Sequence, residues 1–221
     1  MIKVEKDLNS VPDCLKSGKA YNCEDVKIEL KKVYNKKCCY CETKLTKNYA
    51  IEHFRPKQDY KWLEKSWSNL LLVCNSCNSS KGKLFEVANT KQISKITGVN
   101  VHNSAKNLNQ LEEQYLLHPE YDNPEDFFAF EKSGKIKSIK NNKRAEYTIY
   151  LVKLNHTDLI EARYEIIEKF IKELKNKVEN SEIANLIFNF AKESEDKNLS
   201  FTAFRKYTVK NHLLKVISDI K

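Results

Sequence analysis

Four cysteines form two closely spaced pairs that could bind a metal ion. The pairs are Cys38-x-x-Cys41 and Cys74-x-x-Cys77. A spacing of two residues lets a tight turn present both thiolates to one tetrahedral ion, and two such pairs complete the ligand set of a structural Zn²⁺. The alternative is a set of buried or disulfide-bonded cysteines, but disulfides are disfavoured in the cytosol. We therefore expect a structural zinc site at these four residues.

The other three cysteines are expected to stay outside this site. Cys39-x-Cys41 is a second possible pair, but the two-residue spacing makes the usual zinc knuckle. Cys38 is therefore the better ligand, and Cys39 is expected to be a small buried side chain. Cys14 and Cys23 are expected to be bystanders.

Residues suited to phosphodiester chemistry lie between and just after the cysteine pairs. The chain reads Glu52-His53-Phe54-Arg55-Pro56-Lys57, then Trp67-Ser68-Asn69-Leu70, then Cys74-Asn75-Ser76-Cys77-Asn78-Ser79-Ser80-Lys81. Together with the first cysteine pair, this order resembles the HNH endonucleases over about 45 of the 221 residues. The resemblance implies a ββα-metal fold, in which a two-stranded hairpin and one helix surround a catalytic divalent ion.

The resemblance also implies a role for each residue. Hydrolysis of a phosphodiester requires an activated water and neutralisation of the phosphate charge. His53 matches the general base, Glu52 and Asn78 match the ligands of the catalytic ion, and Asn69 matches the residue that braces the loop and orients the base. Many HNH enzymes have Asp and His where this chain has Glu52 and Asn78. Both replacements keep an oxygen ligand, which suits Mg²⁺ or Mn²⁺.

Positive charge is concentrated around this motif. The net charge is +9, and residues 36–83 hold ten Lys and Arg against four Asp and Glu. Arg55, Lys57 and Lys81 are placed to contact phosphate oxygens of a nucleic acid, although Lys57 and Lys81 could equally be solvated surface charges. A compositional bias explains the global charge as well as a binding site does, because 35 of the 39 basic residues are Lys.

A longer resemblance points to one group of HNH nucleases. With the motif above, Leu117-His118-Pro119-Glu120 and Asn123-Pro124-Glu125 make the chain similar to the nuclease subunits (PtuB) of Septu-type bacterial anti-phage systems, which also occur beside some retrons. This similarity implies an antiviral nuclease that acts on nucleic acid, most readily DNA, with a partner ATPase of the PtuA type. Two alternatives stay open: a non-catalytic zinc module that binds nucleic acid or protein, and an HNH-type RNase. The presence of Glu52, His53, Asn69 and Asn78 favours an enzyme over a binding module.

The fold expected to position these residues is α+β and mostly helical, with a zinc-stapled ββα-metal module embedded in a helical scaffold. Gly and Pro total only eight residues, which favours long helices. We expect an N-terminal lead-in and helix over 1–35, the zinc-bound HNH module over 36–90, and a mainly helical scaffold or partner-binding region over 91–221.

Apolar spacing predicts the individual elements. Helices are expected over 24–34 and 157–178, a hairpin over 127–139, and two further helices that begin at Ser181 and Ser200, the second reaching Ile217. The remaining histidines are expected to be structural: His102, His118, His156 and His212. No apolar run is long enough to span a membrane and the N-terminus lacks a signal-peptide core, so we expect a cytoplasmic protein without membrane contact.

Overall fold

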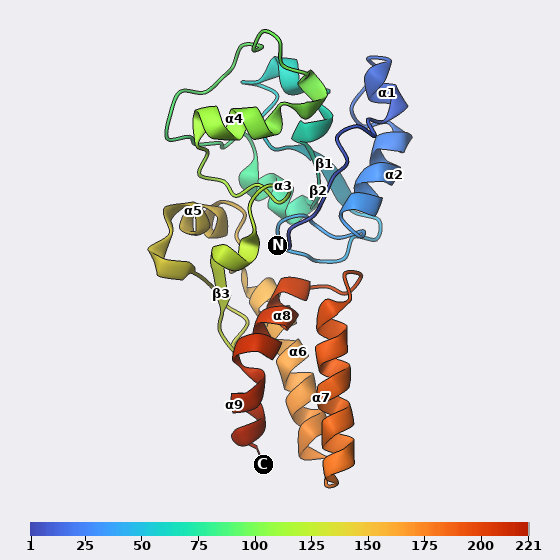
Figure 1. The fold of residues 1–221 in the computed structure, drawn as a ribbon, viewed down its shortest axis with the longest axis vertical. Helices are drawn as coiled ribbons and strands as arrows, with labels where there is room; N and C mark the ends of the chain where they lie inside the picture. The colour runs from blue at the N-terminus through green and yellow to red at the C-terminus, as the bar shows by residue number, and fades with distance from the viewer. Residues whose placement is uncertain (221) are drawn as a thin grey trace.

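The computed structural model describes residues 1–220 (Figure 1). The helices are α1 (Asp13–Lys16), α2 (Glu24–Val33), α3 (Asn75–Lys81), α4 (Ala105–Glu112), α5 (Lys143–Leu151), α6 (Thr157–Lys175), α7 (Asn180–Glu195), α8 (Thr202–Asn211) and α9 (Leu213–Ser218). The strands are β1 (Tyr49–His53), β2 (Leu70–Cys74), β3 (Phe128–Phe130) and β4 (Ile136–Ser138), which form two antiparallel pairs, β1–β2 and β3–β4. The predicted α+β, mostly helical fold is confirmed.

A ββα unit lies at the centre of the larger body. In the β1–β2 pair, Tyr49 faces Cys74 and His53 faces Leu70. Helix α3 follows β2 directly, and the Sγ atom of Cys74 caps it by accepting the backbone N–H of Cys77 at 3.4 Å. The Leu70–Val73 run is fully buried, as expected for a continuous apolar strand that is covered on both faces. Helices α2 and α3 both pack against β2.

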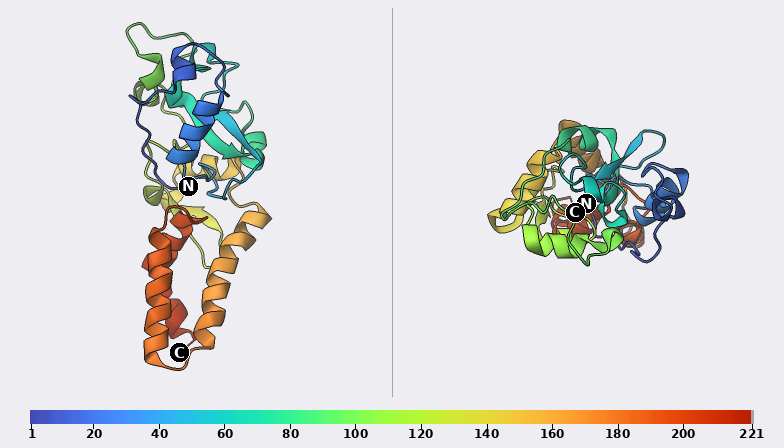
Figure 2. Two further views of the ribbon diagram at one scale, coloured as in Figure 1. Left: turned by 90° about the vertical axis from the view of Figure 1, so that its right-hand side faces the viewer. Right: turned by 90° about the horizontal axis from the view of Figure 1, so that it is seen from above.

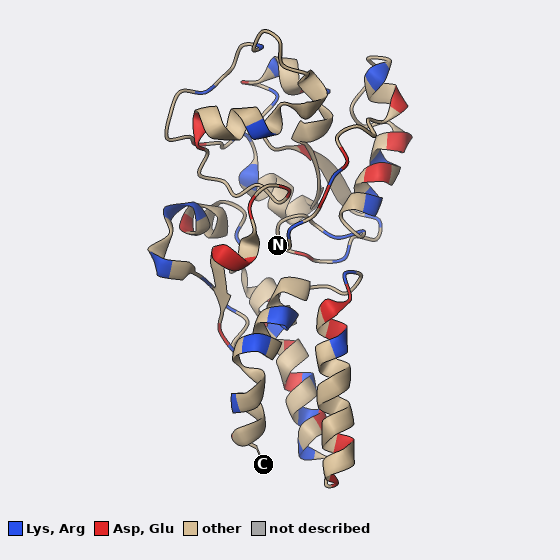
Figure 3. Cartoon of the chain, viewed as in Figure 1, with Lys and Arg blue, Asp and Glu red and all other residues tan. Residues whose placement is uncertain are grey.

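The four C-terminal helices form an arm beside this body. Figures 1 and 2 show α6 to α9 extending away from it, with the N-terminus near the junction and the C-terminus at the far end of the arm. Phe170, Leu174, Phe190, Leu213 and Val216 make a separate hydrophobic cluster inside the arm. Helices α6 and α7 carry acidic and basic residues together (Figure 3), so the arm is not a purely basic surface.

The main hydrophobic core crosses the boundaries predicted at 35/36 and 90/91. Its buried members include Leu30 from α2, Leu71 from β2 and Leu117 from the segment after α4. The ββα unit therefore shares its core with the chain on both sides of it. The division into 1–35, 36–90 and 91–221 stays a prediction.

Several element boundaries differ from those predicted. The helix over 24–34 and the hairpin over 127–139 are confirmed as α2 and β3–β4. Helix α7 begins after Glu179 rather than at Ser181, and α8 begins after Phe201 rather than at Ser200. The last expected helix is two helices that break at His212, whose Nε2 lies 2.7 Å from the carbonyl oxygen of Phe130. The side chain at the break thus contacts β3.

Within residues 1–220, no helix combines the length and the apolar character that a bilayer-spanning segment requires.

Candidate active site

The sulfur atoms of Cys38, Cys41, Cys74 and Cys77 lie together, all within 4.8 Å of one another. Cys38 and Cys41 come from the turn before β1, and Cys74 and Cys77 come from the β2–α3 junction. Cys41 and Cys74 approach to 3.8 Å. Zn–S bonds of about 2.3 Å in a tetrahedron separate the sulfurs by about 3.8 Å, so the cluster fits Zn²⁺. The cluster is consistent with the predicted structural zinc site, and it brings the two ends of the hairpin together.

Cys39 stays outside this cluster, as predicted. It is 4% exposed, and its backbone N–H donates to the carbonyl of Leu72 at 2.9 Å. This bond links the first cysteine turn to β2. Cys39 therefore contributes to the packing of the module, while Cys38 supplies the sulfur.

His53 is the last residue of β1 and is almost fully buried. Its Nε2 lies 2.9 Å from the backbone carbonyl oxygen of Glu64. A carbonyl only accepts hydrogen bonds, so Nε2 carries the proton and Nδ1 is the basic nitrogen of the neutral ring. Burial lowers the pKa of His53 below its usual 6.5, which keeps the imidazole neutral at pH 7. These properties suit a general base.

An aromatic residue from outside the motif contacts the His53 ring. Tyr21 packs edge-on against the imidazole, with ring centroids 4.5 Å apart at an interplanar angle of 73°. The Tyr21 hydroxyl accepts a hydrogen bond from Lys57 Nζ at 3.4 Å. Tyr21 precedes His53 by more than thirty residues, and no spacing or motif in the sequence indicates the contact.

Asn69 braces the chain just after His53. Its Oδ1 accepts the backbone N–H of Arg55 at 2.8 Å, and its Nδ2 donates to the carbonyl of Arg55 at 3.0 Å. The backbone N–H of Phe54 also donates to the Asn69 carbonyl at 2.9 Å. Because its amide is bonded on both sides to the backbone of Arg55, Asn69 holds the chain two residues after His53, which fits the bracing role predicted for it.

Glu52 is paired with a buried lysine. Lys81 Nζ lies 2.6 Å from Glu52 Oε1 and donates to the carbonyl of His53 at 3.0 Å. Burial raises the pKa of Glu52 above its usual 4.5, against the opposing effect of the Lys81 ammonium. The ion pair ties α3 to the end of β1. It also fixes the direction of the carboxylate next to the predicted base.

Asn78 lies on α3, one turn before Lys81, and is half-buried. Residues three apart share a helix face, so Asn78 is on the side of α3 that meets Glu52 through Lys81. The helix packs against β1. Glu52 and Asn78 both carry the oxygen ligands that Mg²⁺ or Mn²⁺ prefers, and their role as ligands of the catalytic ion stays a prediction.

The three predicted phosphate contacts lie in different surroundings. The Arg55 guanidinium is buried, where Nε lies 2.6 Å from Glu112 Oε2 and Nη2 donates to Asn109 Oδ1 at 2.9 Å. Lys81 is buried in its pair with Glu52. The Lys57 side chain is 38% exposed. All three phosphate contacts stay predictions, and for Arg55 and Lys81 they would require the side chains to leave these ion pairs.

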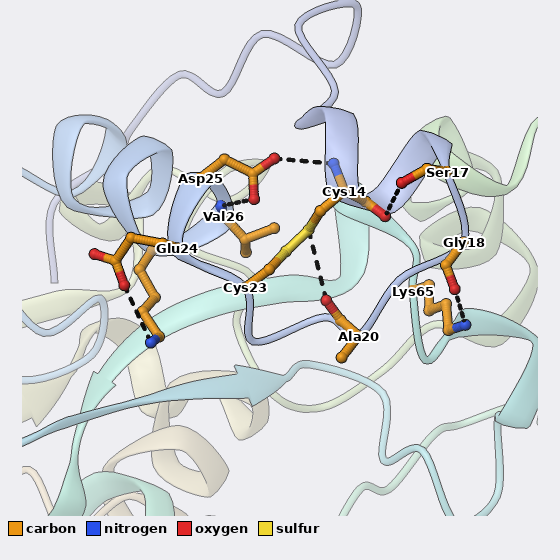
Figure 4. Close-up of a disulfide and its surroundings, with 10 residues drawn as sticks. Cys14, Ser17, Gly18, Ala20, Cys23, Glu24, Asp25, Val26 and Lys65 are labelled. Atoms are coloured by element: carbon orange, nitrogen blue, oxygen red, sulfur yellow. Dashed lines mark hydrogen bonds and ion pairs between the residues drawn. A yellow bond between two sulfur atoms is a disulfide. The ribbon is translucent and has the colours of Figure 1, made fainter.

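Cys14 and Cys23 lie outside the zinc cluster, as expected. They form a disulfide that closes the segment between α1 and the start of α2 (Figure 4). The carboxylate of Asp25 accepts the backbone N–H of Cys14 at 2.9 Å on the same side of the loop. A bond between these two cysteines was not predicted from the sequence.

Comparison with known proteins is consistent with this site. The family model for the HNH endonuclease matches residues 38–84. The Septu protein PtuB of Bacillus mycoides (strain KBAB4) is 34% identical over 163 residues, which cover 66% of this chain and 52% of that protein. The PtuB of Bacillus thuringiensis is 30% identical over 177 residues, which cover 78% of this chain and 56% of that protein.

A second type of Septu protein also matches. The Septu protein PtuA of Bacillus mycoides (strain KBAB4) is 28% identical over 155 residues, which cover 64% of this chain and 20% of that protein. The chain spans about half the length of the PtuB relatives it matches. The region that matches the HNH family model includes the cysteine cluster, His53 and α3. Residues 38–84 are thus an HNH endonuclease domain, and the chain is a homologue of the Septu PtuB proteins.

Proposed function

We propose that this protein is the nuclease of a Septu-type anti-phage system and that it hydrolyses phosphodiester bonds in DNA with the help of Mg²⁺ or Mn²⁺. The observation that carries the proposal is the contact of His53 Nε2 with the Glu64 carbonyl, because it leaves Nδ1 as the base at the end of β1. The HNH domain and the Septu homologues support the same reaction class.

The reaction begins with a water molecule that is hydrogen-bonded to His53 Nδ1. The neutral imidazole takes a proton from this water, and the resulting hydroxide attacks the phosphorus in line with the leaving oxygen. The bond between phosphorus and the leaving oxygen breaks, and that oxygen takes a proton from solvent. The Glu64 carbonyl stabilises the imidazolium that forms, because it accepts the Nε2 proton throughout. Asn69 keeps the backbone after His53 in place during the transfer.

Glu52 and Asn78 would hold the divalent ion, which neutralises charge on the phosphate and the departing oxygen when it is bound. The Lys81 ammonium occupies Glu52 Oε1 and so directs the carboxylate. A zinc ion held by Cys38, Cys41, Cys74 and Cys77 would have a different task. It would hold the turn before β1 against the β2–α3 junction, and with it the spacing of Glu52, His53 and Asn78.

The cellular setting is part of the proposal. A nuclease that acts on phage DNA works in the cytoplasm, and such a nuclease needs a controlling partner, for which an ATPase of the PtuA type is the candidate. The C-terminal arm offers exposed apolar side chains for such a contact, among them Val178, Phe188 and Leu214. Co-purification of a lone chain that is fully active in cells would count against the partner.

The proposal is tested by cleavage of plasmid DNA and of RNA by the wild type and by His53→Ala, with Mg²⁺ or Mn²⁺ and with EDTA. The matched control is His156→Ala, because His156 is exposed and lies outside the site. Zinc content confirms that each variant is folded. We expect wild type and His156→Ala to cut DNA only with the divalent ion, and His53→Ala to be inactive.

The same experiment separates the alternatives. Equal cutting by His53→Ala would remove His53 as the base. Cutting of RNA but not of DNA would favour the RNase. If the wild type cuts neither substrate even with the cognate ATPase, but still binds DNA in EDTA, the protein is a non-catalytic zinc module.

A further inference from the structure

Tyr21, a residue outside the HNH motif, makes a ring contact with His53. Tyr21 lies in the loop before α2, outside residues 38–84. Its ring is half-buried and meets the imidazole edge-on at a centroid distance of 4.5 Å. A residue from outside the domain thus contacts the side chain to which we assign the proton transfer.

A closed set of contacts connects Tyr21 to His53 by a second route. Lys57 Nζ donates to the Tyr21 hydroxyl at 3.4 Å and also lies 3.4 Å from Glu64 Oε1. The backbone carbonyl of the same Glu64 accepts the proton of His53 Nε2. The Lys57 ammonium also lies 4.8 Å from the centre of the Tyr21 ring. Tyr21 and Glu64 therefore both contact the imidazole, and Lys57 links these two residues to each other.

The loop that carries Tyr21 is itself fastened. The Cys14–Cys23 disulfide closes it (Figure 4), and Lys19 N–H donates to the Cys14 carbonyl at 2.8 Å. Lys65, which follows Glu64 in the chain, donates to the carbonyl of Gly18. The loop is thus joined to the same segment that anchors His53. This attachment fixes the position of the Tyr21 ring.

A single hydrogen bond does not hold an imidazole firmly, because the second side-chain torsion of His has a broad energy profile. The edge of an aromatic ring packed against the imidazole narrows the range of torsion angles that the imidazole can adopt. We propose that Tyr21 is a positioning residue that holds the His53 ring in the orientation in which Nδ1 faces the attacking water. This inference rests on the proposed nuclease function and extends it to a residue outside the HNH domain.

The inference predicts a loss in the chemical step rather than in binding. Small displacements of a catalytic group cost up to about 100-fold in rate. We expect Tyr21→Leu to lower kcat at least about tenfold and to change KM by less than about twofold. Tyr21→Phe keeps the ring and should lose less than about threefold in kcat. The matched control is Tyr150→Leu, because Tyr150 is 80% exposed on α5.

A second readout does not depend on cleavage. In ¹⁵N spectra of the imidazole, the wild type and Tyr21→Phe should give one sharp His53 signal set with the proton on Nε2. Tyr21→Leu should give averaged or doubled signals. If the wild type cuts nothing under any condition, the nuclease proposal fails, and these spectra still decide whether Tyr21 orders the ring.

Several results would overturn the inference. The first two are a kcat of Tyr21→Leu equal to that of the wild type, and a change of KM alone in that variant. The other two are a His53 spectrum that is the same in Tyr21→Leu as in the wild type, and equal losses of kcat in Tyr21→Leu and Tyr21→Phe. Zinc content and thermal melting show whether each variant is folded. Should Tyr21→Leu fail to fold, Tyr21→Met takes its place, because it keeps a long apolar side chain without an aromatic edge.

Discussion

Lys81 Nζ and Glu52 Oε1 are 2.6 Å apart, and this buried ion pair joins helix α3 to the strand that carries His53. The Lys81 side chain is fully buried and that of Glu52 is 11% exposed. The ammonium also donates to the carbonyl of His53, so one lysine contacts two consecutive residues of the site. The pair therefore holds α3 against the end of β1, where the proposed chemistry requires it.

Removal of this lysine should destabilise the domain. Lys81→Met leaves the Glu52 carboxylate buried without its partner, and loss of one member of a buried pair costs about 3–5 kcal/mol. Lys91→Met is the matched control, because its pair with Asp59 is partly exposed and such pairs contribute at most about 1 kcal/mol. Urea unfolding measures both free energies of unfolding. Equal and small losses would show that the Glu52–Lys81 pair contributes no more than a surface pair.

The pH dependence of cleavage should follow the buried imidazole. Burial lowers the pKa of His53 below 6.5, so the ring stays neutral, and basic, to a lower pH than a solvent-exposed histidine. We expect kcat/KM to rise with pH through a single step that lies below pH 6.5 and then to level off. The profile of kcat/KM against pH, measured with the divalent ion held saturating, checks this. A step above pH 6.5 would contradict the neutral, buried base.

Acid should also destabilise the fold through a second histidine. Burial lowers the pKa of His118 well below 6.5 in the folded chain. As the pH falls through about 6.5, the imidazole therefore takes up a proton in the unfolded chain while it stays neutral in the folded chain. Stability is therefore full above pH 6.5 and falls as the pH drops below it. His118→Gln should weaken this dependence between pH 7 and pH 5, and His156→Gln, at an exposed position, should not. Melting temperatures measured across that range compare the two variants.

Zinc content distinguishes ligands from neighbours in the cysteine cluster. Cys77→Ser removes one of the four sulfurs, and we expect it to lose zinc and to unfold at a lower temperature, because the metal links segments that are far apart in the sequence. Cys39→Ser is the matched control, because Cys39 is buried outside the cluster. We expect this variant to keep one zinc ion per chain. Elemental analysis of the purified variants measures the number of zinc ions per chain. Loss of zinc from Cys39→Ser would place that sulfur in the site.

The local parts of the site could be predicted from the sequence, and the distant contacts could not. The two Cys-x-x-Cys turns are encoded by spacing alone, and the structure brings their four sulfurs together without Cys39, which is consistent with the predicted ligand set. The pairs Arg55–Glu112 and Tyr21–His53 join residues far apart in the chain. No periodicity specifies which side chains meet across such separations. The contact of His212 with the Phe130 carbonyl, at the break between α8 and α9, is equally distant in sequence.

The Cys14–Cys23 disulfide gives a last prediction, because the cytoplasm in which we place the protein keeps most thiols reduced. Closing a loop of about ten residues stabilises a fold by roughly 2–3 kcal/mol in the chain-entropy description. The purified oxidised protein should therefore be more stable than the Cys14→Ser, Cys23→Ser double variant by about this amount, and dithiothreitol should remove the difference.

The intact mass, measured after rapid alkylation of cells, reports whether the bond exists in vivo. If both cysteines are alkylated there while Tyr21 still orders His53 in the reduced protein, the hydrogen bonds of the loop suffice to hold the ring. If reduction instead disorders the His53 signals, the disulfide and the proposed base are coupled. The oxidation state of two residues outside the HNH domain would then control cleavage.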